Sequence, residues 1–233
     1  MEKIGFIGAY DKTDLIIYVA KILTMLNKKV LVIDSTLIQK ARYVVPVINP
    51  TKAYVTEYEE IDIAVGFSDM EDVKRYLGIA EDQELEYDFI MIDTDNIEGI
   101  KNFGVNEAKL KYFVTSFDNY SLKRGLEPLG ELKEVMTLTK VLFASQAIKE
   151  EDDYLNFLSL GYKIVWNDTR IYFPIENGDL SVLYENQRVA KIKFKRLSAQ
   201  YKDGLASIAQ EIVEDPYGNI VQRAIKSIEK GVG

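Results

Sequence analysis

The chain has 233 residues, contains no Cys and no His, and carries 29 Lys and Arg against 37 Asp and Glu, for a net charge of −8. Without Cys and His there is no disulfide, no thiolate nucleophile, no zinc or iron–sulfur site built on these residues and no imidazole acid–base chemistry. Carboxylates remain as ligands for Mg²⁺, whereas an acidic chain is a poor general binder of nucleic acid.

Short apolar runs alternate with longer helical segments along the chain. The first run, 3–9, is predicted to be a strand, and the apolar spacing of 13–27 predicts a helix after it. The runs 30–33 and 87–92 are apolar on both faces, which is typical of strands inside a parallel sheet. Further strands are expected at 61–67, 111–116, 141–144 and 163–166, and helices at 68–77 (with Ser68 as N-cap), 119–136, 149–160 and 197–214. This order predicts an α/β protein with a doubly wound, mostly parallel sheet flanked by helices.

Two segments interrupt this alternation. The segment 41–60 is rich in Tyr and reads as an irregular, strand-rich insert. The segment 170–196 holds a turn sequence at Glu176-Asn177-Gly178-Asp179 between two extended stretches, which predicts a hairpin. Since no Pro/Gly-rich linker divides the chain, we expect one domain over 1–214 and a C-terminal helical tail over 215–233.

Polar residues gather where three predicted strands end. The first strand runs into Gly8-Ala9-Tyr10-Asp11-Lys12-Thr13, the strand 30–33 ends in Asp34, and the strand 87–92 ends in Asp93. The carboxyl ends of parallel strands meet at one edge of the sheet, where such folds bind ligands. A Lys-Thr pair that opens a helix, with Asp residues at neighbouring strand ends, is the pattern by which a P-loop holds phosphate and Mg²⁺.

With these features the sequence resembles the ParA/MinD-like (deviant Walker A, SIMIBI-type) P-loop ATPase family. Lys12-Thr13, KKVLVID ending at Asp34 and YDFIMIDT over 87–94 carry the resemblance, with Tyr172-Phe173-Pro174 and the helix 197–213 in support. It spans about residues 3–214 and implies a P-loop NTPase-like three-layer sandwich. The resemblance also implies a nucleotide site, or its remnant, at Gly8, Lys12, Thr13, Asp34 and Asp93, with Thr13, Asp34 and Asp93 as the Mg²⁺ ligands if Mg²⁺·ATP binds.

The loop itself departs from the family pattern. Family members carry a loop of the KGGVGKT type, whereas this chain has Tyr10 and Asp11 instead of glycines and lacks the signature Lys before Lys12. Glycine lets successive backbone N–H groups turn toward phosphate at low steric cost, which Tyr and Asp do not. Asp11 and Asp14 also place negative charge beside Lys12, and Asp95-Asn96 replaces the proline pair of the segment that senses the γ-phosphate in the family.

We therefore expect a degenerate member with weak or lost ATP hydrolysis. It would be a positioning, scaffold or regulatory component of a bacterial multiprotein machine, such as a pilus, secretion or division apparatus. The pilus-positioning (TadZ/CpaE-like) branch is the precedent for eroded loops. We assign no catalytic residue and expect no cofactor, with ATP and Mg²⁺ as the alternative. One alternative function is an active ATP-dependent dimerisation switch that uses Lys12, Thr13, Asp34 and Asp93, and another is a DNA-partition protein.

The site residues also have ordinary structural interpretations. Lys12 would then be a surface residue in the first turn of a helix, with Thr13 or Asp11 as its N-cap. Asp34 and Asp93 would solvate the loops that follow their strands.

Basic side chains cluster near the end of the predicted hairpin. The cluster, called here the basic patch, consists of Arg188, Lys191, Lys193, Lys195 and Arg196. Its three lysines alternate with apolar residues, as on one face of a strand. The patch would either bind nucleic acid or an acidic partner, or guard an edge strand against aggregation. The acidic net charge favours the edge strand.

The tail is predicted to contain an amphipathic helix over 219–230. Insertion into a membrane usually needs bulkier apolar residues and more basic charge, so we expect this helix to dock on the body or on a second subunit, with weak membrane contact as the alternative. No apolar run approaches the ~20 residues that span a bilayer. We expect a cytoplasmic protein, with recruitment to the inner face of the membrane as a variant, that has protein partners, forms a homodimer and does not bind DNA.

Overall fold

A single mixed sheet organises the chain. The structure, a computed structural model, describes residues 1–48, 51–80, 82–144 and 149–231. Within these residues the strands are β1 (Glu2–Ile7), β2 (Val30–Asp34), β3 (Tyr54–Tyr58), β4 (Ile61–Val65), β5 (Phe89–Thr94), β6 (Leu110–Ser116), β7 (Met136–Ala144) and β8 (Ile164–Pro174). Their order is β3-β4-β2-β5-β1-β6-β7-β8. Only the β3–β4 pair among them is antiparallel, so the predicted mostly parallel, doubly wound fold is confirmed.

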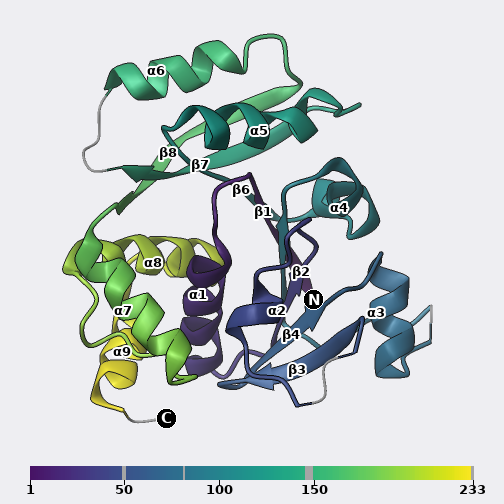
Figure 1. The fold of residues 1–233 in the computed structure, drawn as a ribbon, viewed down its shortest axis with the longest axis vertical. Helices are drawn as coiled ribbons and strands as arrows, with labels where there is room; N and C mark the ends of the chain where they lie inside the picture. The colour runs from purple at the N-terminus through teal and green to yellow at the C-terminus, as the bar shows by residue number, and fades with distance from the viewer. Residues whose placement is uncertain (49–50, 81, 145–148, 232–233) are drawn as a thin grey trace.

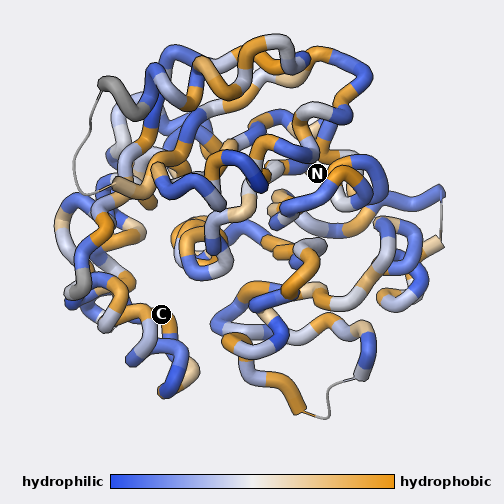
Figure 2. Tube along the Cα trace, turned by 45° about the horizontal axis from the view of Figure 1, so that its top comes forward, coloured by the Kyte–Doolittle hydropathy of each residue, from blue (hydrophilic) through white to orange (hydrophobic). Residues whose placement is uncertain are grey.

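Helices cover both faces of this sheet (Figure 1). They are α1 (Thr13–Met25), α2 (Ala41–Val44), α3 (Met70–Leu77), α4 (Ile97–Asn102), the 3₁₀ turn η1 (Val105–Glu107), α5 (Asn119–Gly130), α6 (Lys149–Leu158), α7 (Asn177–Arg188), α8 (Ala199–Ile212) and α9 (Asn219–Lys230). The core on one face includes side chains of α1, α7, α8 and α9, and the core on the other includes side chains of α3, α4, α5 and α6. In Figure 2 apolar and polar residues alternate along the outer helices, as expected for helices with one buried face.

The central strands follow directly from their sequences. Every residue of β2 and of β5 is buried, in agreement with their continuous apolar runs. Helix α1 is buried on more than one side because it contacts the sheet as well as α8 and α9. Its apolar residues Ile17 and Tyr18 are therefore also covered within this chain.

The predicted hairpin at 170–196 is wrong. Strand β8 continues to Pro174, and the expected turn at 176–179 instead begins the helix α7. The helix is fixed by tertiary contacts, since it buries Val182 and Leu183, and Asp179 accepts hydrogen bonds from Ser198 N (2.7 Å) and Ser198 Oγ (2.7 Å). Long-range packing of this kind overrides a local turn signal.

The basic patch does not lie on an edge strand. Residues 191–197 form an irregular segment, in which Ile192 and Phe194 are buried and the lysines are exposed. The edge of the sheet on this side is β8, where 167–169 bulge out opposite Thr139 because Leu138 pairs with Trp166 and Lys140 with Arg170. A bulge of this kind hinders pairing of the edge strand with another chain. From the sequence alone, this protective role is expected of the lysines of the basic patch.

Two further expectations need local revision. The N-cap of α3 is Asp69, whose carboxylate accepts from Asp72 N at 2.8 Å, and not Ser68. In the insert 41–60, the described residues form α2 and then β3, which pairs with β4 through a turn at Glu59 and Glu60, both with positive φ. Residues 49–50 of the insert lie outside the described residues.

The tail helix α9 packs on the body of the protein. Val221, Ala224 and Ile225 are buried, and α9 contacts α1 and α8. These three side chains are therefore covered within this chain, whereas Ile220 at the start of the helix is exposed. Of the helices that the structure describes, none is both long and apolar enough to cross a membrane.

The N-cap of α5 gives a stability prediction. Asp118 accepts hydrogen bonds from Ser121 N, Ser121 Oγ and Ser116 Oγ, and the two serines lower the pKa of its carboxyl group to about 2. Replacing Asp118 by alanine should lower the free energy of unfolding by about 1 kcal/mol at pH 7. Since the folded-state pKa lies below the unfolded value of 3.8, this contribution is present above pH 4 and is lost as the pH falls toward 2.

Urea unfolding of the wild type and of Asp118→Ala measures the loss of stability at pH 7 and at pH 2.5. Asp118→Asn is the matched control, because asparagine keeps the cap and loses the titration. Equal losses for Asp118→Ala at the two pH values would contradict the assignment.

Candidate functional site

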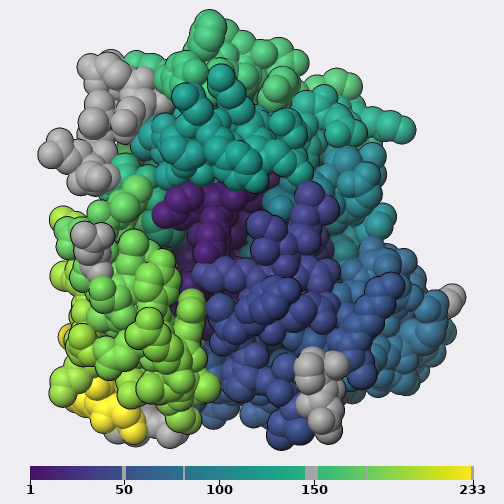
Figure 3. All heavy atoms as spheres, in the orientation of Figure 1, coloured from purple at the N-terminus to yellow at the C-terminus, as the bar shows by residue number. Residues whose placement is uncertain are grey.

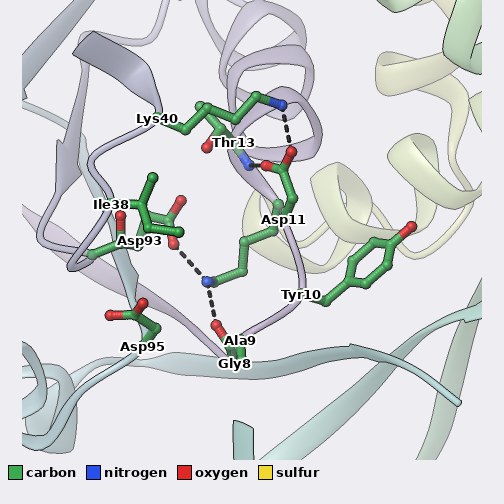
Figure 4. A pocket seen from close by; sticks show the side chains of 11 residues that line it. Gly8, Ala9, Tyr10, Asp11, Thr13, Ile38, Lys40, Asp93 and Asp95 are labelled. Atoms are coloured by element: carbon green, nitrogen blue, oxygen red, sulfur yellow. Dashed lines mark hydrogen bonds and ion pairs between the residues drawn. The ribbon is translucent and has the colours of Figure 1, made fainter. Parts of the chain in front are cut away.

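A cleft opens where β1, β2 and β5 end. It encloses about 280 Å³ and is lined by Gly8, Ala9, Tyr10, Asp11, Lys12, Thr13, Thr36, Ile38, Lys40, Asp93 and Asp95. In Figure 3 the N-terminal residues, in purple, lie at the bottom of a hollow between the neighbouring segments. Figure 4 shows the side chains converging from the loop 8–13, from the segment after β2 and from the end of β5. Of the predicted site residues, Gly8, Lys12, Thr13 and Asp93 line this cleft, and Asp34 lies next to Asp93 across the β2–β5 pair.

The loop begins at a position that requires glycine. Gly8 has φ +142°, and a Cβ atom there would lie 2.2 Å from the carbonyl oxygen of Val114. The loop therefore presses against β6 at its first residue and then runs into α1. Helix α1 starts without a side-chain cap, although Asp11 Oδ1 accepts a hydrogen bond from Thr13 N at 3.3 Å.

Lys12 is buried and fully engaged. Its side chain is 2% exposed, its Nζ donates to the carbonyl oxygen of Gly8 at 2.7 Å, and the same Nζ lies 2.7 Å from Asp93 Oδ1. The alternative of a surface lysine in the first turn is therefore wrong. Both interactions use the ammonium group, which is the group that a P-loop lysine offers to phosphate.

Burial has the largest effect on the pKa of Asp93. Removal from water raises the pKa of its carboxyl group, the positive charge of Lys12 lowers it, and the nearby Asp34 raises it again, with a result of about 7. Apart from the Lys12 ammonium group, Asp93 Oδ1 has no hydrogen-bond donor among the described residues, so Lys12 is its main compensation. A charge in such an environment depends strongly on its partner.

Asp34 organises the chain that follows β2. Its Oδ1 accepts from Thr36 N (3.1 Å) and Thr36 Oγ1 (2.6 Å), and its Oδ2 accepts from Ala41 N (2.9 Å). These bonds hold the segment 36–41 against the rim of the cleft. The carboxylate thus has the role expected of an aspartate that stabilises the loop after its strand.

Lys40 is a charged residue of the cleft that the sequence did not indicate, and the same holds for the uncharged Thr36 and Ile38. Its Nζ forms ion pairs with Asp11 and Asp14. Burial lowers the pKa of Lys40, but the charges of Asp14 and Asp11 outweigh it and raise the pKa to about 12. Asp14 also accepts from Gln187 Nε2 at 2.9 Å, which ties this cluster to α7. No periodic pattern marks Lys40, because it lies in an irregular segment after a strand.

Tyr10 does not fill the cleft. Its ring packs on Phe143 with 4.6 Å between the ring centroids, and in Figure 4 the side chain points away from Asp93. The loop is bridged instead by the Lys12 side chain, which reaches back to the carbonyl oxygen of Gly8.

The basic patch lies apart from this cleft and is partly neutralised. Lys191 Nζ is 2.7 Å from Glu59 Oε1, and Arg196 pairs with Glu185. None of the patch residues lines the cleft.

The cleft carries more negative than positive charge in this arrangement. Two lysines (Lys12 and Lys40) and three aspartates (Asp11, Asp93 and Asp95) line the cleft, so the formal net charge of its lining is −1. Each of the two lysines is already paired with a carboxylate. In the described part of the chain, no group of three or more Asp and Glu side chains is arranged to hold a metal ion.

The sheet order and the position of the cleft define an α/β protein with a P-loop NTPase-like fold. Solved structures agree. A chain of the MinC:MinD cell division protein complex of Aquifex aeolicus matches with a TM-score of 0.55 and 16% identity over 89% of this chain and 95% of that one. A ParA family ATPase from Chlorobium tepidum matches with a TM-score of 0.55 and 16% identity, over 89% of this chain and 98% of that one. An ATP complex of McdA from Cyanothece matches with a TM-score of 0.56 and 9% identity, over 92% of this chain and 96% of that one.

The fold is thus that of the ParA/MinD-type ATPases, as the sequence resemblance implied. At these identities the likeness concerns the fold. No family model and no curated protein matches the sequence.

Proposed function

We propose that this chain is a degenerate ParA/MinD-like protein, with weak or lost ATP hydrolysis, that acts as a positioning, scaffold or regulatory component of a bacterial multiprotein machine. One observation carries the proposal: the ammonium group of Lys12 is paired with Asp93 and hydrogen-bonded to Gly8, so it is not offered to phosphate. The net negative lining of the cleft supports the same conclusion, because a nucleotide brings several more negative charges.

The positioning role is proposed from the fold. One similar structure is a chain of the MinC:MinD cell division protein complex. We propose protein partners for this chain as well, a second copy included, and a cytoplasmic location. The pilus-positioning branch of the family remains the proposed precedent.

The DNA-partition alternative has less support. Two members of the basic patch, Lys191 and Arg196, are paired with carboxylates, and the net charge of the chain is −8. Phosphate contacts require clustered free cations.

A titration with Mg²⁺·ATP tests the proposal. Calorimetry of the purified protein should detect no binding tighter than about 1 mM, which corresponds to roughly −4 kcal/mol. Phosphate release should equal that of the Lys12→Ala variant, because Lys12 does not support turnover. A ParA-type ATPase with an intact glycine-rich loop is the positive control. Micromolar binding together with Mg²⁺-dependent turnover that Lys12→Ala abolishes would establish the active switch instead.

A further inference from the structure

The Lys12–Asp93 ion pair points to a specific cause for the loss of nucleotide binding. We propose that Asp93 is an internal latch: its carboxylate occupies the ammonium group of Lys12 in place of a phosphate, and removing this one carboxylate opens the cleft to a polyphosphate. The inference rests on the proposed function. It adds that the residue able to bind an anion, Lys12, is still present in the cleft but is occupied by an internal carboxylate.

The contact has the features of a strong internal competitor. Lys12 Nζ and Asp93 Oδ1 are 2.7 Å apart, and their side chains are 2% and 3% exposed. Because water is excluded, an external anion must replace the carboxylate directly, and Asp93 must then either stay charged without its partner or take up a proton. Among the described residues, Asp93 Oδ1 has no hydrogen-bond donor to take over this compensation. Wild-type protein should therefore reject anions even though Lys12 lines the cleft.

The other cation of the cleft is held differently. Lys40 pairs with two carboxylates, of Asp11 and of Asp14, and Asp14 is held in turn by Gln187. Removing either carboxylate leaves Lys40 with the other. Within the described part of the chain, Lys12 has Asp93 as its single carboxylate partner, so a single substitution is enough to release it.

Asp95 provides a matched control within the same cleft. It lines the cleft and carries the same charge as Asp93. Its Oδ1 accepts from Leu37 N and from Asn96 Nδ2, both at 3.0 Å, and it forms no ion pair with Lys12. Asp95→Asn removes one negative charge from the cleft and leaves the latch closed, whereas Asp93→Asn removes one negative charge and opens it.

The experiment uses inorganic tripolyphosphate without Mg²⁺ as the probe, so that neither metal binding nor hydrolysis enters the readout. Calorimetry is performed on the full chain as wild type, Asp93→Asn, Asp95→Asn and the double variant Lys12→Ala/Asp93→Asn. Asp93→Asn should bind roughly 10- to 100-fold more tightly than the wild type, since each tenfold step needs about 1.4 kcal/mol and a buried pair exceeds that. Asp95→Asn should change the affinity by less than about threefold, as expected for a charge that is screened by solvent. The double variant Lys12→Ala/Asp93→Asn should bind tripolyphosphate no more tightly than the wild type.

Three results would overturn the latch: no gain for Asp93→Asn, an equal gain for Asp95→Asn, or a gain that persists without Lys12. If wild-type protein already binds Mg²⁺·ATP tightly, the proposed function fails first. If neither the wild type nor folded Asp93→Asn binds tripolyphosphate, the proposed function stands and the latch is wrong.

A measurement on the wild type covers the case in which Asp93→Asn does not fold. Lysine ¹⁵Nζ NMR, with Lys12 assigned by its absence in Lys12→Arg, should show a slowly exchanging ammonium group that 10 mM tripolyphosphate does not shift. A rapidly exchanging Lys12 signal, or one that moves with tripolyphosphate, would contradict the latch without any variant at Asp93.

Discussion

Asp152→Ala is expected to lower the free energy of unfolding by about 3–5 kcal/mol, because it leaves a buried lysine without its carboxylate. Lys140 is 1% exposed and Asp152 is 2% exposed. Lys140 Nζ donates to Asp152 Oδ1 and to Asn156 Oδ1, each at 2.6 Å, and Arg170 pairs with Asp152 Oδ2 at 2.9 Å. Asp152 thus joins α6 to both β7 and β8, at the edge of the sheet.

Urea unfolding of a short series measures this effect. Asp153→Ala is the matched control, since this neighbouring aspartate is exposed, and it should change the stability by less than about 0.5 kcal/mol. The double variant Lys140→Met/Asp152→Ala should be more stable than Asp152→Ala alone, because it contains no unpaired buried ammonium group. A loss below about 1 kcal/mol for Asp152→Ala would show that water reaches Lys140.

Gly8→Ala is expected to destabilise the protein by about 3–5 kcal/mol, since backbone strain and a steric clash add up at this position. The φ of +142° is unfavourable for any residue with a Cβ, and the new methyl group would lie 2.2 Å from the carbonyl oxygen of Val114 on β6. Backbone atoms of a central strand cannot move aside as a flexible side chain can. The loop that carries Lys12 is therefore seated on the sheet by this glycine.

Gly78→Ala separates the two contributions. Gly78 ends α3 with a φ of +72°, and among the described residues no atom lies within 4 Å of the place that a Cβ would take. This variant should lose only about 1 kcal/mol, the cost of the left-handed backbone alone. Thermal and urea unfolding of both variants measure the difference, and equal losses would remove the role assigned to the contact with Val114.

Some features of the site were predictable because they depend on neighbours in the sequence. The continuous apolar runs that end at Asp34 and Asp93 required central strands, and parallel strands bring their carboxyl ends together. The proximity of Lys12, Asp34 and Asp93 follows from that. The absence of Cys and His limited the chemistry to lysine, carboxylates, hydroxyls and backbone amides from the outset.

Other features required the three-dimensional arrangement. The turn sequence at 176–179 became the start of α7 because Asp179 bonds to Ser198 and the helix buries its apolar side chains against distant segments. Lys40 reaches Asp11 and Asp14 from an irregular segment that has no periodicity to read.

The sequence by itself therefore determined the class of fold, the edge of the sheet at which the cleft opens and the residue types that line it, because the positions of strands and helix starts along the chain depend on short-range patterns. Only the tertiary structure decided which charges pair there. Lys12 faces Asp93 and Lys40 faces Asp11 and Asp14 because burial makes each unpaired charge costly, and the cost depends on groups brought together from distant parts of the chain.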